Sequence, residues 1–371
     1  MRLEPFKLER IMSQWQNEVE FDLSSSGVDA ANLRDFISPA ELETLWSDTK
    51  LRFVQTNGPI PLRDAILRKY PGASRDNVLV TNGSSEALMT LLWKLCEPGV
   101  ELVEVSPTYS LVGGLARTFG ATVKQVHLRE EAGWRLDLES LDRVISRSTR
   151  IIYVCNPNNP TGSILTETEM AAIVAAAERS GALLIADEIY IGAELDGRTT
   201  ASLWGRCART VVTSSVSKAH GLAGLRLGWM VGPADIIGDV WRYHDYTTTT
   251  TTALSADLVT MALQPDRERV LLERALKISR ANFEILEQWM LRHPDLVSGE
   301  RTRIGGLAFV KVRAPRGTED LAFRLAKNSG LLVGPGAYFG AESYLRIGYS
   351  VPNLEAGLSR LAEGLRQAAE S

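Results

Sequence analysis

One lysine stands among residues that could support covalent chemistry on a bound ligand. An apolar run at 211–212 leads into a cluster of hydroxyls that includes Ser215 and Ser217, and Lys218 follows directly. Glycines come next, and Arg226 lies eight residues beyond the lysine. Hydroxyls and a planar, permanently charged guanidinium are groups that bind a phosphate. The alternative is a surface loop with a solvated lysine, since lysine side chains are usually exposed.

A second stretch has the outline of an anion site. Residues 78–81 are typical of a strand, and Asn82-Gly83-Ser84-Ser85 follows it. Beyond that, leucines recur at helical spacing from Leu88, which predicts that a helix begins near the serines. Free N–H groups and the positive end of a helix dipole would face a ligand there. A serine that merely caps the helix is the alternative. Together with the lysine stretch, the pattern favours phosphate binding by Ser84 and Ser85.

Two further apolar runs end in polar groups. The run 183–186 ends in Asp187, and Tyr190 follows three residues later. The run 151–155 leads into a loop with two prolines and a glycine, which would hold Asn159 rigidly. Because the carboxyl ends of parallel strands meet at one edge of a sheet, we expect these side chains to lie near Lys218.

Three other residues are candidates for ligand contacts. Tyr109 follows a strand-like run at 101–105 and could stack on a flat ring. Arg346 lies between apolar neighbours, where a charge is costly to bury unless it meets an anion. Pairing with an acidic side chain is the alternative for Arg346. Gly27 follows three serines after an extended segment. This stretch could be an ordinary turn, or its backbone N–H groups could bind an anion.

Four of these blocks together resemble the class I and II aminotransferases, which are fold-type I enzymes that use pyridoxal 5′-phosphate. The blocks are Gly-Ser-Ser, Asn-Pro-Thr-Gly, Asp-x-x-Tyr and Ser-x-Ser-Lys, and they occur in the order of the family. The resemblance extends from about residue 20 to about residue 365. It implies an enzyme that transfers an amino group between an α-amino acid and a 2-oxo acid, in amino acid metabolism or biosynthesis.

The resemblance also implies a role for each candidate residue. Lys218 would form the Schiff base with the cofactor and act as the catalytic base, assisted by Asp187 and Tyr190. Asp187 would pair with the pyridine nitrogen, and Tyr190 would bond to the ring oxygen. The expected cofactor-binding residues are Ser84, Ser85, Tyr109, Asn159, Asp187, Tyr190, Ser215, Lys218 and Arg226. The expected substrate-binding residues are Gly27, Asn159 and Arg346, with Arg346 on the α-carboxylate.

One residue departs from the family pattern. Relatives often have a tyrosine at the position of Phe53, where its hydroxyl reaches the phosphate of the neighbouring subunit. Phe53 has no such hydroxyl. The threonine run from Thr247 to Thr252 could contribute to the partner's phosphate site, or could simply be a bent β-branched segment. The family pattern implies a homodimer.

The segments 23–28, 83–87 and 346–350 also resemble cyclases of the capreomycidine synthase type, which dehydrate and cyclise hydroxyarginines. Such a cyclase should have a closed, acid-lined pocket for a guanidinium. An alternative of another class is a non-catalytic module that senses pyridoxal phosphate, as in certain transcription regulators. Those proteins carry an additional N-terminal DNA-binding domain, whereas only a short segment precedes the family pattern in this chain.

Composition narrows the remaining possibilities. The 371 residues carry a net charge of −4, which argues against a nucleic-acid or anionic-membrane surface. The three cysteines and four histidines show no disulfide framework and no metal-ligand spacing, so we expect no metal. The first residues lack the long apolar run of a signal peptide, and no run is long enough to span a membrane. We therefore expect a cytoplasmic protein.

Alternating strand and helix patterns predict an α/β fold of the fold-type I class. We expect a large cofactor-binding domain with a mostly parallel sheet at 45–250. We expect a smaller α+β domain formed by 1–44 and 251–371.

Overall fold

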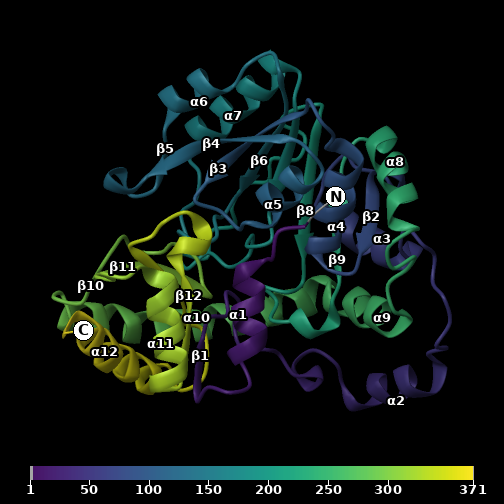
Figure 1. The fold of residues 1–371 in the computed structure, drawn as a ribbon. Helices are drawn as coiled ribbons and strands as arrows, with labels where there is room; N and C mark the ends of the chain where they lie inside the picture. Colours follow the sequence, from purple (N-terminus) through teal and green to yellow (C-terminus); the bar gives the residue numbers. More distant parts are fainter. Residues whose placement is uncertain (1–2, 371) are drawn as a thin grey trace.

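The computed structural model describes residues 3–370, so Met1, Arg2 and Ser371, which we assign to the small domain, lie outside the described residues. The chain forms two sheets, one of eight strands and one of five, each with its own helices (Figure 1). The predicted α/β fold is confirmed. The expected boundaries at residues 45 and 250 remain a prediction.

The eight-stranded sheet has the order β2-β9-β8-β7-β6-β3-β4-β5. Strands β8, β7, β6, β3 and β4 run parallel, while β2, β9 and β5 are antiparallel to their neighbours, so the sheet is mixed but largely parallel. The strands are β2 (Val78–Thr81), β3 (Glu101–Ser106), β4 (Thr122–Arg129), β5 (Arg135–Leu136), β6 (Thr149–Cys155), β7 (Leu183–Asp187), β8 (Thr210–Ser215) and β9 (Gly228–Val231).

Helices cover both faces of this sheet, which is why its central strands are apolar on both sides. Successive residues of β6 point into opposite cores: Ile152 packs in one and Ile151 in the other. One face carries α3 (Ile60–Leu67), α6 (Leu138–Val144), α7 (Glu167–Ser180) and α9 (Ala253–Ala262). The other carries α4 (Ser84–Leu95), α5 (Leu111–Thr118) and α8 (Ala234–His244).

Local sequence signals explain where one of these helices begins and ends. The Thr166 hydroxyl accepts from the Glu169 N–H, and the Glu169 carboxylate accepts in return from the Thr166 N–H. Gly181 then ends α7 in the left-handed conformation, with φ of 70°. The capping box and the left-handed glycine thus define the two ends of α7.

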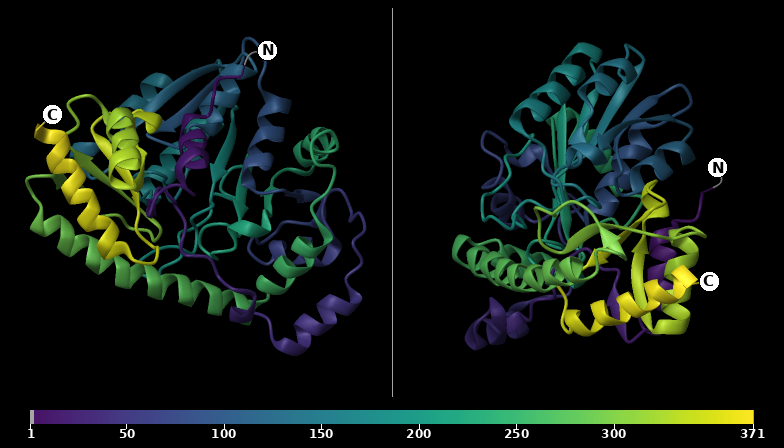
Figure 2. Two further views of the ribbon diagram at one scale, coloured as in Figure 1. Left: turned by 60° about the horizontal axis from the view of Figure 1, so that its bottom comes forward. Right: turned by 90° about the vertical axis from the view of Figure 1, so that its left-hand side faces the viewer.

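The five-stranded sheet has the order β1-β12-β13-β11-β10 and is antiparallel apart from the β1–β12 pair. Its strands are β1 (Phe21–Leu23), β10 (Val297–Ser298), β11 (Leu307–Val312), β12 (Leu331–Pro335) and β13 (Tyr344–Gly348). The helices beside it are α10 (Pro265–Arg292), α11 (Thr318–Ser329) and α12 (Leu354–Glu370). The long α10 extends from α9 toward α12 and so runs along both units (Figure 2).

Helix α1 (Lys7–Trp15) lies at the junction of the two units (Figures 1 and 2). Its Leu8 belongs to a core of the eight-stranded sheet, whereas Ile11 belongs to the core of the five-stranded sheet. A single amphipathic helix therefore contacts both cores. Helix α2 (Pro39–Asp48) lies at the periphery, and short 3₁₀ helices occur at Leu33–Asp35, Arg75–Asn77, Glu130–Ala132, Ala223–Leu225 and Gly336–Phe339.

Candidate active site

A cavity of about 560 Å³ opens at the carboxyl ends of β6 and β7, between the two units. Side chains from both ends of the chain and from its middle line it. Nine of the residues predicted from the sequence are among them: Ser84, Ser85, Tyr109, Asn159, Asp187, Tyr190, Lys218, Arg226 and Arg346. The structure thus brings together most of the candidates, whose individual roles remain predictions.

Lys218 follows the end of β8 and reaches across the cavity. Its ammonium donates to the Ser26 hydroxyl at 2.9 Å. Burial and the nearby charge of Arg346 lower the Lys218 pKa to about 8, well below the usual 10.5. Gly27 lies against this side chain, because a Cβ added there would be 3.5 Å from Lys218 Cδ. Gly27 itself is not among the residues that line the cavity.

Asp187 ends β7 and is 5% exposed. Burial raises its pKa to about 6, although the Ile189 N–H at 3.3 Å and the Tyr153 hydroxyl at 3.4 Å both contact the carboxylate. The hydroxyl of Tyr190 is also buried, and it has no hydrogen-bond partner among the residues described. A buried carboxylate that is short of positive charge and an unsatisfied phenol are both suited to a polar ligand.

The start of α4 forms a cradle with Arg226. Gly83 occupies the N-cap position with φ of 82°, and no side chain caps the helix. A Cβ on Gly83 would lie 2.7 Å from Arg226 Nη2, so the guanidinium rests directly on the glycine. The N–H groups of Ser84 and Ser85 begin the helix at the same place. This arrangement of a guanidinium over a helix N-terminus is suited to a phosphate.

Ser215, at the end of β8, makes a local hydrogen bond. Its hydroxyl accepts from the Ser217 N–H at 3.0 Å, and it does not line the cavity as described. Ser217 does line the cavity. The role of Ser215 therefore remains a prediction.

Arg346, on β13, is 1% exposed. Its Nη1 donates to Asn159 Oδ1 at 3.2 Å and its Nη2 to the Ser24 carbonyl at 2.6 Å, while Nε has no partner among the described residues. The guanidinium also lies 5.1 Å from the centre of the Phe339 ring. Both hydrogen-bond partners are uncharged, so the side chain holds a buried positive charge at the cavity. A carboxylate ligand would compensate it.

Helix α1 and the residue before it also contribute to the cavity, which no sequence motif indicates. Phe6, Glu9 and Met12 line the cavity, and the Tyr109 hydroxyl donates to Glu9 Oε1 at 2.5 Å. The rings of Phe6 and Tyr109 are 5.0 Å apart. Apolar spacing predicts the helix itself, but no motif marks Glu9.

The threonine run is anchored at the same end of α4. The hydroxyls of Thr247 and Thr248 donate to Glu86 Oε1 at 2.5 and 2.8 Å, and the Asn82 N–H donates to Oε2 at 2.6 Å. Although burial opposes ionisation of Glu86, the nearby His244 Nε2 at 3.4 Å and these hydrogen bonds lower the pKa of Glu86 to about 2. The run thus bends against the start of α4 in the same chain.

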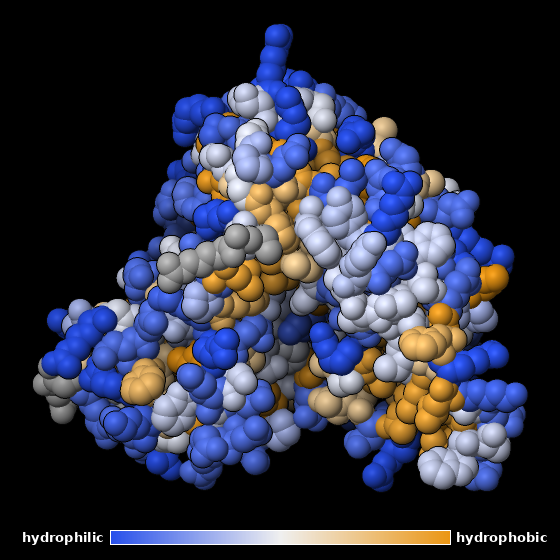
Figure 3. Space-filling view, turned by 45° about the vertical axis from the view of Figure 1, so that its right-hand side comes forward, coloured by the Kyte–Doolittle hydropathy of each residue, from blue (hydrophilic) through white to orange (hydrophobic). Residues whose placement is uncertain are grey.

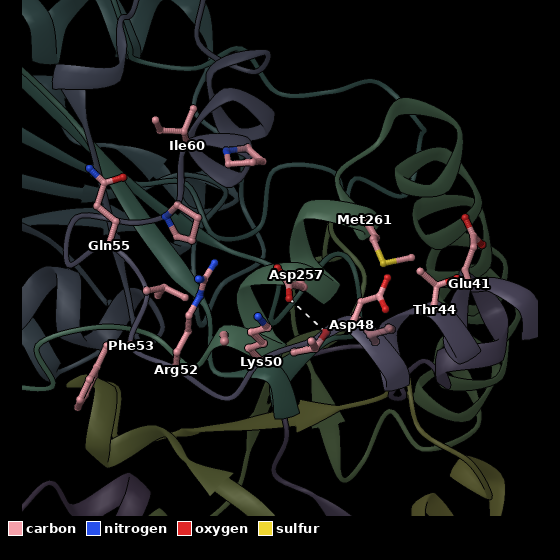
Figure 4. A pocket seen from close by; sticks show the side chains of 16 residues that line it. Glu41, Thr44, Asp48, Lys50, Arg52, Phe53, Gln55, Ile60, Asp257 and Met261 are labelled. Carbon is pink, nitrogen blue, oxygen red and sulfur yellow. Dashed lines mark hydrogen bonds between the residues drawn. The ribbon is translucent and has the colours of Figure 1, made fainter.

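A larger cleft, of about 910 Å³, lies elsewhere, between α2, the segment 49–55 and α9 (Figure 4). It contains none of the predicted site residues. Across it, the Thr49 hydroxyl donates to Asp257 at 3.4 Å. Phe53 lines the cleft and is 87% exposed. Size alone therefore does not locate the chemistry in this molecule.

Residues 3–370 contain no group of three or more histidine, cysteine or acidic side chains placed to hold a metal ion. In the same range, none of the helices combines the length and the apolar character needed to cross a membrane.

The sequence of residues 21–361 matches the family model of aminotransferase classes I and II. The chain belongs to this family. It is 31% identical over 366 residues to capreomycidine synthase from Streptomyces vinaceus, covering 95% of this chain and 93% of the relative.

Two solved structures have nearly the same fold. A PLP-dependent aminotransferase from Streptococcus suis superposes with a TM-score of 0.91 at 28% identity, covering 99% of each chain. The PLP-dependent cyclase OrfR superposes with a TM-score of 0.89 at 27% identity, covering 99% of this chain and 98% of its own. The two neighbours differ in reaction type, so the fold does not distinguish transamination from cyclisation.

As a member of this family, the protein uses pyridoxal 5′-phosphate, the cofactor predicted from its sequence. The cavity fits it in three respects. The Arg226 cradle at the start of α4 suits its phosphate. The unsatisfied Tyr190 hydroxyl suits a polar ring substituent, and the buried Asp187 suits a protonated ring nitrogen.

Proposed function

We propose that the protein transfers the amino group of an α-amino acid to a 2-oxo acid, using pyridoxal phosphate held covalently by Lys218. The observation that carries this proposal is that Lys218, Asp187 and Arg346 line one cavity. These three residues supply an amine, a buried carboxylate and a buried cation, which match the aldehyde, the ring nitrogen and the substrate carboxylate respectively.

Arg346 and Lys218 have different roles in the proposed reaction. Arg346 binds the α-carboxylate through its guanidinium, which orients the Cα–H bond toward the cofactor ring. Lys218 would hold the cofactor through Nζ, and the same amine, when free, would take the α-proton of the substrate. A pKa of about 8 leaves part of this amine neutral near physiological pH, as a base requires. Bound pyridoxal phosphate supplies an electron sink for the charge that develops at Cα.

Asp187 and Tyr190 set the electronic state of the site. A carboxylate at Asp187 keeps a proton on the ring nitrogen, and the positive charge that it meets there would lower its raised pKa. Tyr190 and Asn159 would hold the ring oxygen by hydrogen bonds. Phe6, at the N-cap of α1, and Met12, on the helix, add apolar side chains to the lining of the cavity.

A second candidate is the dehydration and cyclisation of a hydroxylated arginine. Glu9 favours it, because an acidic side chain in the cavity is what a guanidinium substrate requires. The similarity to capreomycidine synthase over 95% of the chain supports the same reading. The two reactions share the removal of the α-proton and differ in what leaves afterwards.

One experiment separates these candidates. The purified holoprotein is mixed with single amino acids, including arginine and hydroxyarginines, and the products are analysed by mass spectrometry. Release of a 2-oxo acid with formation of the aminated cofactor supports transamination. Loss of water without a 2-oxo acid supports the cyclase.

Lys218→Ala tests the step that both candidates share. This variant should no longer retain cofactor after borohydride reduction and should lose at least about 10³-fold in rate. Circular dichroism checks that it is folded. A Lys218→Ala protein that still traps the cofactor would disprove the assignment.

We also propose that the protein is a cytoplasmic homodimer. The side of the molecule that carries α2 and α9 has apolar side chains at its surface (Figure 3). Trp46, Leu51 and Phe53 are each more than 85% exposed, which is costly for a monomer. The three free cysteines suit a reducing compartment. A fully active monomer by light scattering would contradict the dimer.

A further inference from the structure

One charged side chain in the cavity has no role in the proposed transamination. Arg226 has an expected partner in the phosphate, Asp187 in the ring nitrogen and Arg346 in the substrate carboxylate. Lys218 holds the cofactor. Of the charged residues that line the described cavity, Glu9 is the one that remains. An amino acid with a neutral side chain would offer no cationic group to the Glu9 carboxylate.

Glu9 is held at a defined place rather than on a free tail. Leu8 and Ile11, on either side of it in α1, are buried in the cores of the two units. The ring of Phe6 packs against Tyr109. The Tyr109 hydroxyl then donates to one carboxylate oxygen, Oε1. Since a carboxylate offers about four acceptor positions, this bond orients Glu9 and leaves it able to accept from a ligand.

The position of Glu9 is complementary to that of Arg346. The negative charge of Glu9 acts on both Arg346 and Lys218 and favours their charged forms, so it lies within electrostatic reach of the reacting groups. An amino acid whose carboxylate is bound by Arg346 has its side chain free to extend elsewhere in the cavity. Every cation among the described lining residues already has an expected partner, so an acidic side chain would meet none to compensate it.

We propose that Glu9 binds the side chain of the substrate, and that the substrate is therefore an α-amino acid with a cationic side chain, either a guanidinium or an ammonium. This inference rests on the proposed function, which fixes the α-carboxylate at Arg346. Glu9 is exposed in the structure, and a long side chain lying beneath α1 would bury the ion pair. Burial strengthens such a pair because the local dielectric constant falls.

Matched ligands test the proposal. L-Citrulline has nearly the shape of L-arginine but carries no charge, and L-ornithine carries an ammonium in place of the guanidinium. The dissociation constant and the turnover of each are measured with the holoprotein, by its absorbance change and by product mass. We expect L-arginine or L-ornithine to bind about 10- to 100-fold more tightly than L-citrulline. Whichever of the two binds better identifies the cationic group.

Glu9→Gln keeps an acceptor for Tyr109 but removes the charge. It should weaken binding of the cationic ligand about 10- to 100-fold and leave L-citrulline within about 2-fold. Glu18→Gln, beyond the end of α1 and outside the cavity, is the matched control and should change neither. An equal loss for charged and neutral ligands would mean that Glu9 only supports the fold, and would overturn the proposal.

The outcomes also separate this inference from the proposed function. If neutral amino acids such as L-norleucine are converted as well as L-arginine, the enzyme is an aminotransferase and only the role of Glu9 is refuted. If no amino acid is bound or converted, the proposed function itself fails and the inference fails with it.

Discussion

Lys218 Nζ and Ser26 Oγ are joined by a hydrogen bond of 2.9 Å between residues 192 positions apart in the chain. Lys218 follows β8 of the eight-stranded sheet, and Ser26 follows β1 of the five-stranded sheet. The amine is therefore positioned by both units at once. Any separation of the two units would break this bond and release the lysine.

The lowered pKa of Lys218 predicts how the cofactor-free protein takes up pyridoxal phosphate. Only the neutral amine attacks the aldehyde, so the attachment rate should rise with pH and level off above about pH 8, whereas an ordinary lysine would require a pH near 10.5. Arg346→Gln removes a charge that lowers this pKa, so the midpoint should move upward, by roughly one unit or less. Borohydride trapping at each pH measures the rate.

Arg360→Gln is the control for this experiment. Arg360 lies on α12 and pairs at the surface with Glu20 at 3.7 Å. Its replacement should leave the midpoint where it is. A midpoint that moves downward in Arg346→Gln would show that the two cations do not interact as described.

Burial of Asp187 predicts a variant that is more stable but less active. The folded-state pKa of about 6 exceeds the ordinary 3.8, so the unfolded chain releases this proton first as the pH rises. The free energy of unfolding therefore falls as the pH rises from about 4 to about 6, and it stays lowered by the full amount above pH 6. In the cofactor-free protein at pH 8, Asp187→Asn should raise the free energy of unfolding by on the order of 2–3 kcal/mol.

Urea unfolding at pH 8 and at pH 4 measures this effect. The gain should vanish at pH 4, where the carboxyl is protonated in the native state. Turnover of the holoenzyme should fall at least about 100-fold, because the ring nitrogen loses its counter-charge. An equal change in stability at both pH values would contradict the argument.

A pair of glycines tests the phosphate cradle. Gly83 and Gly72 have nearly the same φ, 82° and 80°, so an alanine should strain both by about 1–2 kcal/mol. A Cβ on Gly83 would lie 2.7 Å from Arg226 Nη2, whereas a Cβ on Gly72 meets nothing within 4 Å. Only Gly83→Ala should weaken the binding of pyridoxal phosphate, by about 10-fold or more. Equal dissociation constants for the two variants would contradict the cradle.

Much of this site could be predicted because its residues follow short buried strands. The runs before Asp187 and Lys218 are β7 and β8, and their carboxyl ends meet because the two strands are parallel neighbours. The start of α4 at Ser84 follows from the leucine spacing beyond it. These signals are local, so the sequence contains them in full.

Other contacts could not be predicted because they depend on distant segments. Glu9 and Tyr109 are 100 positions apart, and their bond exists only once α1 lies between the two units. The Ser215 hydroxyl accepts from the Ser217 N–H and keeps its own proton to donate, so its expected bond to a phosphate remains a prediction.

The origin of the residues around the cavity has a consequence for how specificity can change. Asn159, Asp187 and Lys218, which we propose to bind the cofactor, come from the eight-stranded sheet and its loops. Glu9 and Arg346, proposed to select the substrate, come from the two ends of the chain. A fragment containing only the eight-stranded sheet would keep the groups proposed for the cofactor but could not choose between amino acids. Substitutions at Glu9 and its neighbours in α1 can therefore change the substrate, whereas a change at Arg346 also affects Asn159 and Lys218.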